Sequence, residues 1–366
     1  MRIRAVRGLA VEVPLRRPVT VGGITSLSRD YTLAIVETDA GLRGVGYGLA
    51  HTGEVAAVIE RNLQPLLLGE DPLQTELLWE RMYIGARHIG RKGTVMRAIS
   101  AVDIALWDIK AQVAGLPLYR LLGGYRDTVP VLASGGYTPE DGVEALAEEM
   151  SGYVAAGHSM VKISVGALPP EEDLRRVQAT RAAIGPHTKL IVDVNGAWRQ
   201  AKPVIKLARQ MADCGLAFIE EPFGPDYLPA LKAFAAAVDT PLAVGEAESG
   251  RWAFRDLLVA GVVDALCHDA TLVGGVSEWL KVTTMAAAWD VMILPHSSPE
   301  LHIHLAAAVP NALAVEVISP QTGVVNLHEL VENPVRPQFG LAAPPSVPGL
   351  GIQWNWDAIA RYRKDR

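Results

Sequence analysis

Cysteine is scarce in this chain of 366 residues: only Cys214 and Cys267 are present, far apart and in no paired motif. Two such residues build no disulfide framework, and their low number fits a reducing compartment. Apolar runs of 18 residues are also missing, so we expect no membrane span and no membrane partner. The first residues, MRIRAVRGLAVEVPL, alternate like a strand and do not resemble a signal peptide. These absences predict a soluble cytoplasmic protein.

Positive charge is not in excess either. The chain has 34 Lys and Arg residues against 40 Asp and Glu residues, a formal net charge of −6. Such a balance creates no field that would attract a polyanion, so we expect no nucleic-acid partner. With 49% hydrophobic residues, the chain can bury a large core. A globular protein that acts on a small molecule is the expectation.

The N-terminal third has the pattern of an α+β domain. Residues 2–13 alternate, and two further strands lie within residues 32–48, which predicts an antiparallel sheet interrupted by a polar, Arg-rich loop. Helical patterns follow at residues 53–66, 72–84 and 94–113. We assign residues 1–125 to this domain. Residues 326–366, which are rich in Pro and Gly at first, are expected to return and pack against it.

From residue 129 onwards, short apolar strands alternate with Ala-rich helices. This alternation is typical of βα units around a parallel sheet. Eight strand segments can be placed, which predicts a closed α/β barrel over residues 126–325: VPVLAS, MVKISVG, KLIVDVN, AFIEEPF, PLAVGEA, ALCHDA, VMILPHSS and ALAVEVI.

Ionisable residues end seven of these strands, about one βα unit apart: Lys162, Asp193, Glu220, Glu246, Asp269, His296 and Glu316. In a closed barrel these positions converge on the C-terminal face, where barrel enzymes keep their chemistry. So many buried charges are costly unless they bind something. The three acids Asp193, Glu220 and Glu246 form an oxygen site suited to Mg²⁺ or Mn²⁺. The alternative is that they merely form salt bridges to barrel lysines.

Several motifs together resemble one family: SAVDIALWDIKAQVAGLPLYRLLGG, VDVNGAW, FIEEP, VGEAE, DATLVGGV and LPHSSPELHIHLAAAVP. The chain resembles the enolase superfamily and, within it, the mandelate racemase subgroup (mandelate racemase/muconate lactonizing enzyme-like proteins). The resemblance implies a (β/α)₇β TIM-like barrel with an α+β capping domain. It also implies Mg²⁺ at the acid triad and loss of the proton α to a carboxylate through an enediolate.

Roles for four further residues follow from the resemblance. His296 would be the general base, with Asp269 bonded to its other ring nitrogen. Glu316 would donate a hydrogen bond to the substrate carboxylate, which requires a protonated acid, and Lys162 would contact that carboxylate. A histidine at a strand end is otherwise a core residue, and this is the interpretation we give to the remaining histidines near the site: His268, His302 and His304.

The chain departs from the family pattern on the second barrel strand. A racemase has Lys-x-Lys there, while this chain has Lys162 and Ser164; Leu272 also replaces a lysine. Racemisation needs a base on each face of the carbon, and a serine without a partner base cannot serve. We therefore expect a lyase that dehydrates a sugar acid, unless Lys162 acts as the second base. The alternatives are a racemase or epimerase of a hydroxy acid or amino-acid derivative, and a catalytically silent barrel.

Loops of the capping domain are expected to contact the substrate. They contain Arg16 and His51, and a second basic segment runs from Arg87 to Lys92. Arginine suits bidentate recognition of a carboxylate, but the same charges are equally consistent with a solvated face or a contact in a homo-oligomer, which we also expect. Inside the barrel, Ser164 and Asn195 are the further candidates for substrate contact, because Asn195 faces the same way as Asp193.

Overall fold

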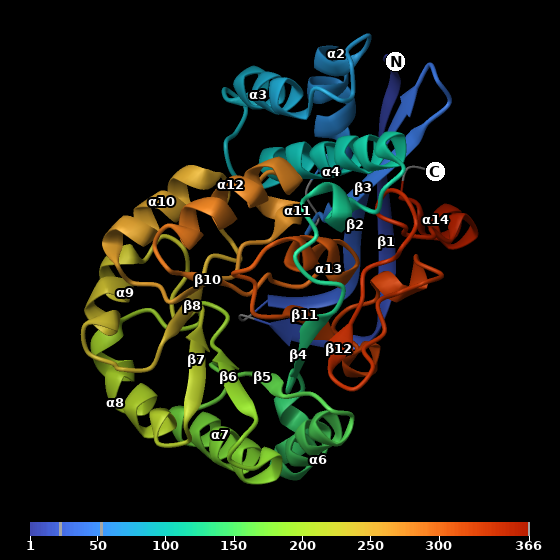
Figure 1. Ribbon diagram of the computed structural model, residues 1–366. Helices are drawn as coiled ribbons and strands as arrows, with labels where there is room; N and C mark the ends of the chain where they lie inside the picture. The colour runs from blue at the N-terminus through green and yellow to red at the C-terminus, as the bar shows by residue number, and fades with distance from the viewer. Residues whose placement is uncertain (22–23, 52–53, 365–366) are drawn as a thin grey trace.

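The computed structural model describes residues 1–21, 24–51 and 54–364. An antiparallel sheet with its own helices covers a barrel of parallel strands that is surrounded by helices (Figure 1). In the described part of the chain, no helix combines the length and the apolar character that a membrane crossing requires.

The capping sheet is larger than the sequence predicted. It has the order β1 (Ile3–Val21), β2 (Ile24–Thr38) and β3 (Arg43–Leu49). The segment expected to be an Arg-rich loop instead continues both strands as a hairpin, with Val19 paired to Ser26 and Thr20 to Thr25. The prediction of a loop was wrong because β-branched residues at 19–21 and 24–25 favour paired strands over coil. Arg17, on this extension, forms an ion pair with Asp141 of the barrel domain at 3.3 Å.

Among the described residues of the N-terminal part, five helices and a π-helical turn follow the sheet: α1 (Val55–Val58), the turn Ile59–Leu63, α2 (Gln64–Leu67), α3 (Thr75–Ala86), α4 (Thr94–Ala114) and α5 (Leu118–Leu121). Helix α4 lies directly on β3, and two glycines of that strand make the close approach possible. A Cβ atom at Gly46 would come within 1.9 Å of the Ala101 carbonyl oxygen, and one at Gly44 within 2.1 Å of the Ala105 carbonyl oxygen.

The barrel strands follow in chain order around the ring: β4 (Val129–Gly135), β5 (Met160–Ser164), β6 (Lys189–Asp193), β7 (Leu216–Glu220), β8 (Leu242–Val244), β9 (Ala265–Leu266), β10 (Met292–Ile293) and β11 (Val315–Ile318). Strand β11 pairs in parallel with β4. The ring closes because Ile293 donates to the Asn311 carbonyl at 2.9 Å and accepts from the Leu313 amide at 2.8 Å.

A helix follows each of the first seven barrel strands: α6 (Gly142–Ala155), α7 (Pro170–Ile184), α8 (Ala201–Ala212), α9 (Leu228–Ala235), α10 (Arg251–Ala260), α11 (Ala270–Val273) with α12 (Gly275–Ala287), and α13 (Pro299–Ala308). Strand β11 leads instead into the 3₁₀ turns Pro320–Thr322 and Leu327–Glu329. The expected (β/α)₇β barrel with an α+β cap is confirmed.

Alternation along the strands explains how one barrel holds both an apolar core and a polar mouth. A buried cluster fills the interior, and most of its members stand two positions before a residue of the polar mouth: Leu132, Met160, Ile191, Cys267, Leu294 and Ala314. Because side chains of a strand repeat with period two, the later residue points the same way, one layer higher. Lys162, Asp193, Asp269, His296 and Glu316 are placed above the apolar layer by this rule.

The C-terminal segment returns to the cap, where both chain ends lie (Figure 1). It contributes β12 (Leu341–Ala342), which pairs with β4, and α14 (Trp356–Tyr362). Asn326 donates to the Val13 carbonyl at 2.9 Å, and Arg363 forms an antiparallel bridge with Val11. The contacts of Asn326 and Arg363 are with β1 of the cap, whereas β12 pairs with the barrel strand β4. We propose on the β1 contacts that residues 326–366 act as part of the cap together with residues 1–125, and that residues 126–325 form the barrel.

Candidate active site

Lys162 stands at the centre of a buried cluster of carboxylates contributed by β6, β7 and β11. Its Nζ lies 2.5 Å from Glu220 Oε1, 2.9 Å from Glu316 Oε1 and 3.2 Å from Asp193 Oδ2. None of these four side chains is more than 4% exposed. Asp193 pairs with Glu220 across neighbouring strands, which sets the two carboxylates at one level.

Burial and charge act on Lys162 in opposite directions. Burial lowers the pKa of the ammonium group, but Glu220, Glu316 and Asp193 outweigh it and hold the pKa well above its usual value. Lys162 is therefore a cation among these carboxylates. Its Nζ atom is enclosed by three ion pairs and its side chain is 1% exposed, which argues against Lys162 as a second base.

Glu316 differs from expectation in its charge. Burial alone would raise its pKa, but Lys162 in particular, together with His296, lowers the pKa to about 2. Its Oε2 also accepts from the Ser297 amide at 2.6 Å. Beside Lys162, Glu316 is therefore an anion, whereas the role implied by the family resemblance uses the protonated acid.

The three acids predicted to bind a metal do meet. One oxygen from each of Asp193, Glu220 and Glu246 lies within 4.8 Å of the others. Glu220 Oε2 and Glu246 Oε2 are buried without a hydrogen-bond partner among the described residues. Ion pairs with Lys162 account for the burial of the Asp193 and Glu220 carboxylates but not for that of Glu246. Three convergent carboxylates with unsatisfied oxygens fit a hard divalent cation.

Glu221 supports the third of these acids from behind. Its Oε1 accepts from the Gly245 amide at 2.5 Å and from the Glu246 amide at 3.0 Å. Burial, and then the Glu246 charge, raises the pKa of Glu221 to about 8. Glu221, next to Glu220 on the chain, thus holds backbone in place instead of facing the cluster.

His296 and Asp269 form the predicted dyad. His296 Nδ1 lies 3.3 Å from Asp269 Oδ2, and Nε2 faces the triad, 3.8 Å from Glu246 Oε2. Asp269 is held by the Thr271 amide, which donates to Oδ1 at 2.7 Å. Burial opposes charging of the ring, but Glu246 and then Asp269 raise the pKa of His296 to about 10. With 27% of its side chain exposed at the mouth, His296 is not a core histidine.

The position of the missing second lysine is occupied by a hydrogen-bonded pair. Asn195 Nδ2 donates to Ser164 Oγ at 3.2 Å, while the Asn195 amide donates to Asp193 Oδ1 at 2.9 Å. Asn195 has a left-handed backbone, with φ +52°. Ser164 thus has an amide donor beside it and not a base, which leaves its hydroxyl hydrogen available for a substrate oxygen.

Two residues of the site were missed from the sequence. Ser134 Oγ lies 2.7 Å from the Tyr137 hydroxyl, and both side chains are buried. The pKa of Tyr137 is raised well above its usual value by burial and then by Glu316, which places the ring beside the cluster. A signal for Ser134 was present, because it stands two positions after Leu132 and next to the last residue of the first barrel strand.

On the cap side, the cations near His51 are Arg97 and Arg29, not the loop arginines that the sequence predicted. Desolvation, and then the charges of Arg97 and Arg29, lowers the pKa of His51 to about 4. Arg97 donates to the Leu49 carbonyl at 2.6 Å, and Arg29 to the Val324 carbonyl at 2.7 Å. Both arginines lie within regular elements, α4 and β2, and so do not belong to the basic loops of the capping domain.

The basic loop residues behave differently from one another. Lys92 approaches the site indirectly, through Glu248 Oε2 at 2.7 Å. Arg16 is exposed on the hairpin, and its charge lowers the pKa of His328, after the larger effect of burial. The structure therefore brings His51 to the mouth but leaves Arg16 at its edge.

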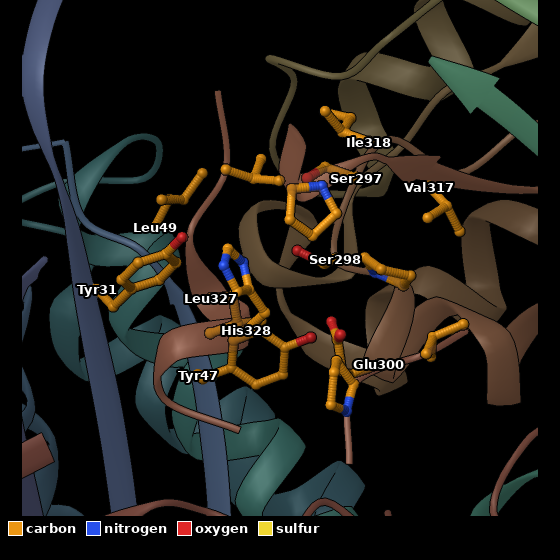
Figure 2. Close-up of a pocket in the computed structure, with 15 residues that line it drawn as sticks. Tyr31, Tyr47, Leu49, Ser297, Ser298, Glu300, Val317, Ile318, Leu327 and His328 are labelled. Atoms are coloured by element: carbon orange, nitrogen blue, oxygen red, sulfur yellow. The ribbon is translucent and has the colours of Figure 1, made fainter. Parts of the chain in front are cut away.

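A cavity of about 70 Å³ lies beside the dyad, between cap and barrel. Figure 2 shows Tyr31, Tyr47 and Leu49 of the cap on one side and residues from the start of α13 on the other. The Tyr47 hydroxyl and Glu300 Oε2 have no hydrogen-bond partner among the described residues, and burial raises the pKa of Glu300.

Comparison with known proteins accounts for both parts of the chain. Residues 3–123 match the mandelate racemase / muconate lactonizing enzyme N-terminal domain, and residues 145–358 match the enolase C-terminal domain-like family. The chain belongs to the mandelate racemase/muconate lactonizing enzyme family. It is thus an enzyme of the enolase superfamily, as its motifs predicted.

Members of this family that are similar over their full length differ in their named reactions. D-galactarolactone cycloisomerase of Agrobacterium fabrum is 34% identical, with 99% of each chain covered. Arabinonate dehydratase of Saccharolobus solfataricus is 32% identical, over 95% of this chain and 94% of the relative. The structure of a racemase from Streptomyces coelicolor A3(2) with bound magnesium superposes with a TM-score of 0.92 at 31% identity, covering 99% and 100% of the two chains.

Proposed function

We propose that this enzyme dehydrates a sugar acid, with Mg²⁺ as cofactor and His296 as the base that removes the proton α to the carboxylate. The observation that carries the proposal is the asymmetry of the site. A His296–Asp269 dyad faces the acid triad on one side, whereas Ser164, bonded to Asn195, stands at the position of a second base.

Asp193, Glu220 and Glu246 would hold the Mg²⁺ ion. When bound, Mg²⁺ supplies positive charge that stabilises the negative charge developing on the substrate carboxylate as its α proton leaves. The oxygen-only donor set and the unsatisfied carboxylate oxygens support this assignment. The magnesium in the related racemase structure supports the choice of metal.

The reaction needs one face of the substrate only. Lys162, a fixed cation, binds the substrate carboxylate. A divalent cation bound to Glu246 would offset the charge that raises the pKa of His296, which makes the neutral ring available. Neutral His296 takes the α proton while Asp269 accepts a hydrogen bond from Nδ1 and so keeps the lone pair on Nε2. The resulting enediolate returns to a carboxylate, and a double bond forms between the α and β carbons as the β C–O bond breaks. His296 returns its proton to the departing hydroxyl. Water leaves, and the enol becomes a 2-keto acid.

The remaining contacts have supporting roles in this proposal. Ser164 and Asn195 bind hydroxyl groups of the substrate, and His51 contacts its distal end together with Arg97. Arg16 contributes at the edge of the mouth. Glu316, as an anion, holds Lys162 and the Ser297 amide in place and thereby orients the group that binds the carboxylate.

Two related outcomes are supported by specific observations. If the β oxygen belongs to a lactone or anhydro ring, the same elimination opens the ring without loss of water; the similarity to a galactarolactone cycloisomerase favours this candidate. A racemase is favoured by the solved structure of that name, but Ser164 and the enclosed, ion-paired Lys162 weigh against it.

The test is a panel of mono- and diacid sugars and their lactones, incubated with the Mg²⁺-loaded enzyme in D₂O and followed by NMR and mass spectrometry. Loss of water with formation of a keto acid is the expected result. An isomeric product of unchanged mass would identify a cycloisomerase, and deuterated substrate of inverted configuration a racemase. His296→Asn should abolish whichever activity is found. Absence of exchange across the panel would contradict the proposal and indicate a silent barrel.

A further inference from the structure

His302, on α13, connects the backbone on either side of the dyad. Its Nδ1 lies 2.7 Å from the Ser297 carbonyl oxygen, and its Nε2 accepts from the Ala270 amide at 3.0 Å. Ser297 directly follows His296, and Ala270 directly follows Asp269. The ring is completely buried. One side chain therefore bonds the residue after the base to the residue after its acidic partner.

The chemistry of the two backbone groups specifies the state of this ring. The Ala270 amide can only donate, so Nε2 must be unprotonated; the Ser297 carbonyl can only accept, so Nδ1 must carry the hydrogen. Asp269 Oδ1 lies 3.6 Å from Nε2, too far for a hydrogen bond. Burial lowers the pKa of His302, which keeps the ring neutral.

The turn that His302 holds is strained. Ser297 has φ +52° and Ser298 φ +47°, a left-handed conformation that non-glycine residues rarely adopt in succession. Such a turn persists where its surroundings hold it. Here Glu316 accepts from the Ser297 amide at 2.6 Å, and His302 donates to the Ser297 carbonyl. Figure 2 shows Ser297 and Ser298 at the cavity beside the start of α13.

We propose that His302 is a positioning residue, which sets the separation of His296 and Asp269 by bridging Ser297 and Ala270. The inference rests on the proposed function for its catalytic consequence, but its geometric part is independent of the substrate. Without the bridge, the strained turn after His296 is free to relax and the ring moves relative to both Asp269 and the acid triad.

The same helix provides a matched control. His304 is equally buried and also bridges two backbone groups: it accepts from the Tyr119 amide at 3.3 Å and lies 2.9 Å from the Leu350 carbonyl oxygen. These groups belong to α5 and to the C-terminal segment, not to the dyad. Replacing His304 removes equivalent bonds and equivalent volume without touching Ser297 or Ala270.

The experiment compares His302→Leu with His304→Leu in the Mg²⁺-loaded enzyme, together with two conservative variants. In His302→Asn the amide nitrogen stands where Nδ1 did and can still donate to Ser297. In His302→Gln the amide oxygen reaches the place of Nε2 and can still accept from Ala270. Steady-state kcat and KM are measured, and crystal structures give the distance from His296 Nδ1 to Asp269 Oδ2.

We expect His302→Leu to lower kcat about 10²-fold with KM nearly unchanged, because the reacting groups are displaced while the groups that bind substrate are kept. Asn and Gln should each restore part of that loss, and His304→Leu should leave kcat unaltered. The dyad distance should exceed hydrogen-bonding range in His302→Leu alone.

Three results would overturn the inference: full kcat in His302→Leu, equal losses in the two leucine variants, or an unchanged dyad distance in His302→Leu. If His302→Leu does not fold, kcat and the distance from His296 Nδ1 to Asp269 Oδ2 in the Asn and Gln variants decide the inference, and wild-type values of both in both variants would overturn it. If the wild-type enzyme turns over no acid sugar, the proposed function fails, and the crystallographic distances still decide whether His302 positions the dyad.

Discussion

Replacing Lys162 by Met should destabilise the metal-free protein in a way that depends on pH. The substitution removes the cation at the centre of the cluster and keeps most of the side-chain volume. Three carboxylates, from Glu220, Glu316 and Asp193, then face one another in the barrel without a positive charge.

The magnitude follows from the distances. At separations of 2.5, 2.9 and 3.2 Å, each ion pair of Lys162 contributes about 5 to 7 kcal/mol of attraction at an effective dielectric constant of about 20. Most of this attraction is offset by the desolvation of the four groups. Removing one partner of a buried pair typically costs about 3–5 kcal/mol, and we expect a loss of this size in the free energy of unfolding at pH 8.

The sign of the pH effect distinguishes this cause from a packing defect. Without Lys162, the native pKa of Glu316 rises from about 2 past the unfolded value of about 4.3 for Glu, and that of Glu220, which burial already raises, rises further. A group with a raised native pKa contributes stability that is complete below the unfolded pKa and is lost as the pH rises through the native pKa. The deficit of Lys162→Met should therefore be largest at pH 8 and shrink towards pH 5. Mg²⁺ should also reduce it.

Urea denaturation at pH 5 and pH 8, with and without Mg²⁺, measures these differences. Lys92→Met is the control, because Lys92 forms its ion pair with Glu248 at 2.7 Å while 59% exposed, and such pairs contribute at most about 1 kcal/mol. A deficit in Lys162→Met that is the same at both pH values, or no larger than that of Lys92→Met, would refute the electrostatic account.

Three further substitutions test other parts of the site. Asp269→Asn should lower the rate of α-proton exchange in D₂O about 10²- to 10⁴-fold without changing Mg²⁺ affinity, because it removes the acceptor that orients His296; a rate within tenfold of wild type would contradict this role. Glu246→Gln should weaken Mg²⁺ binding in calorimetry and lower the pKa of His296 from about 10, since the Glu246 charge is the main factor that raises it. An unchanged or higher pKa of His296 in an NMR titration would contradict this role of Glu246. Ser164→Lys should introduce exchange from the opposite face of the substrate, and deuterium in one configuration only would argue against the proposed geometry.

Much of the site could be predicted because its residues follow a local rule. Two-residue alternation and one βα unit per strand suffice to place Lys162, Asp193, His296 and Glu316 at one end of a barrel. The same rule applied to hydroxyl groups would also have found Ser134. The pairing of Val19 with Ser26 and of Thr20 with Thr25 was missed because a polar, Arg-rich composition resembles a loop, whereas strand pairing depends on the partner strand.

The charges of the site could not be predicted in this way, because a pKa depends on distances between groups that come from separate strands. Only the tertiary structure shows that Lys162 reaches three carboxylates, and that Glu316 is consequently an anion with a pKa of about 2. The arginines near His51 belong to α4 and β2, and no local pattern in the sequence shows that these elements bring them to the barrel mouth.

The sequence by itself determined the family, the barrel and the acid triad, since these depend on the period of the strands and on motifs read along the chain. The tertiary structure alone decided which groups are charged, that the Asn195 amide bonds to Ser164, and that His302 bridges Ser297 and Ala270. These properties arise where segments remote in sequence come within hydrogen-bonding distance, and no local pattern specifies that distance.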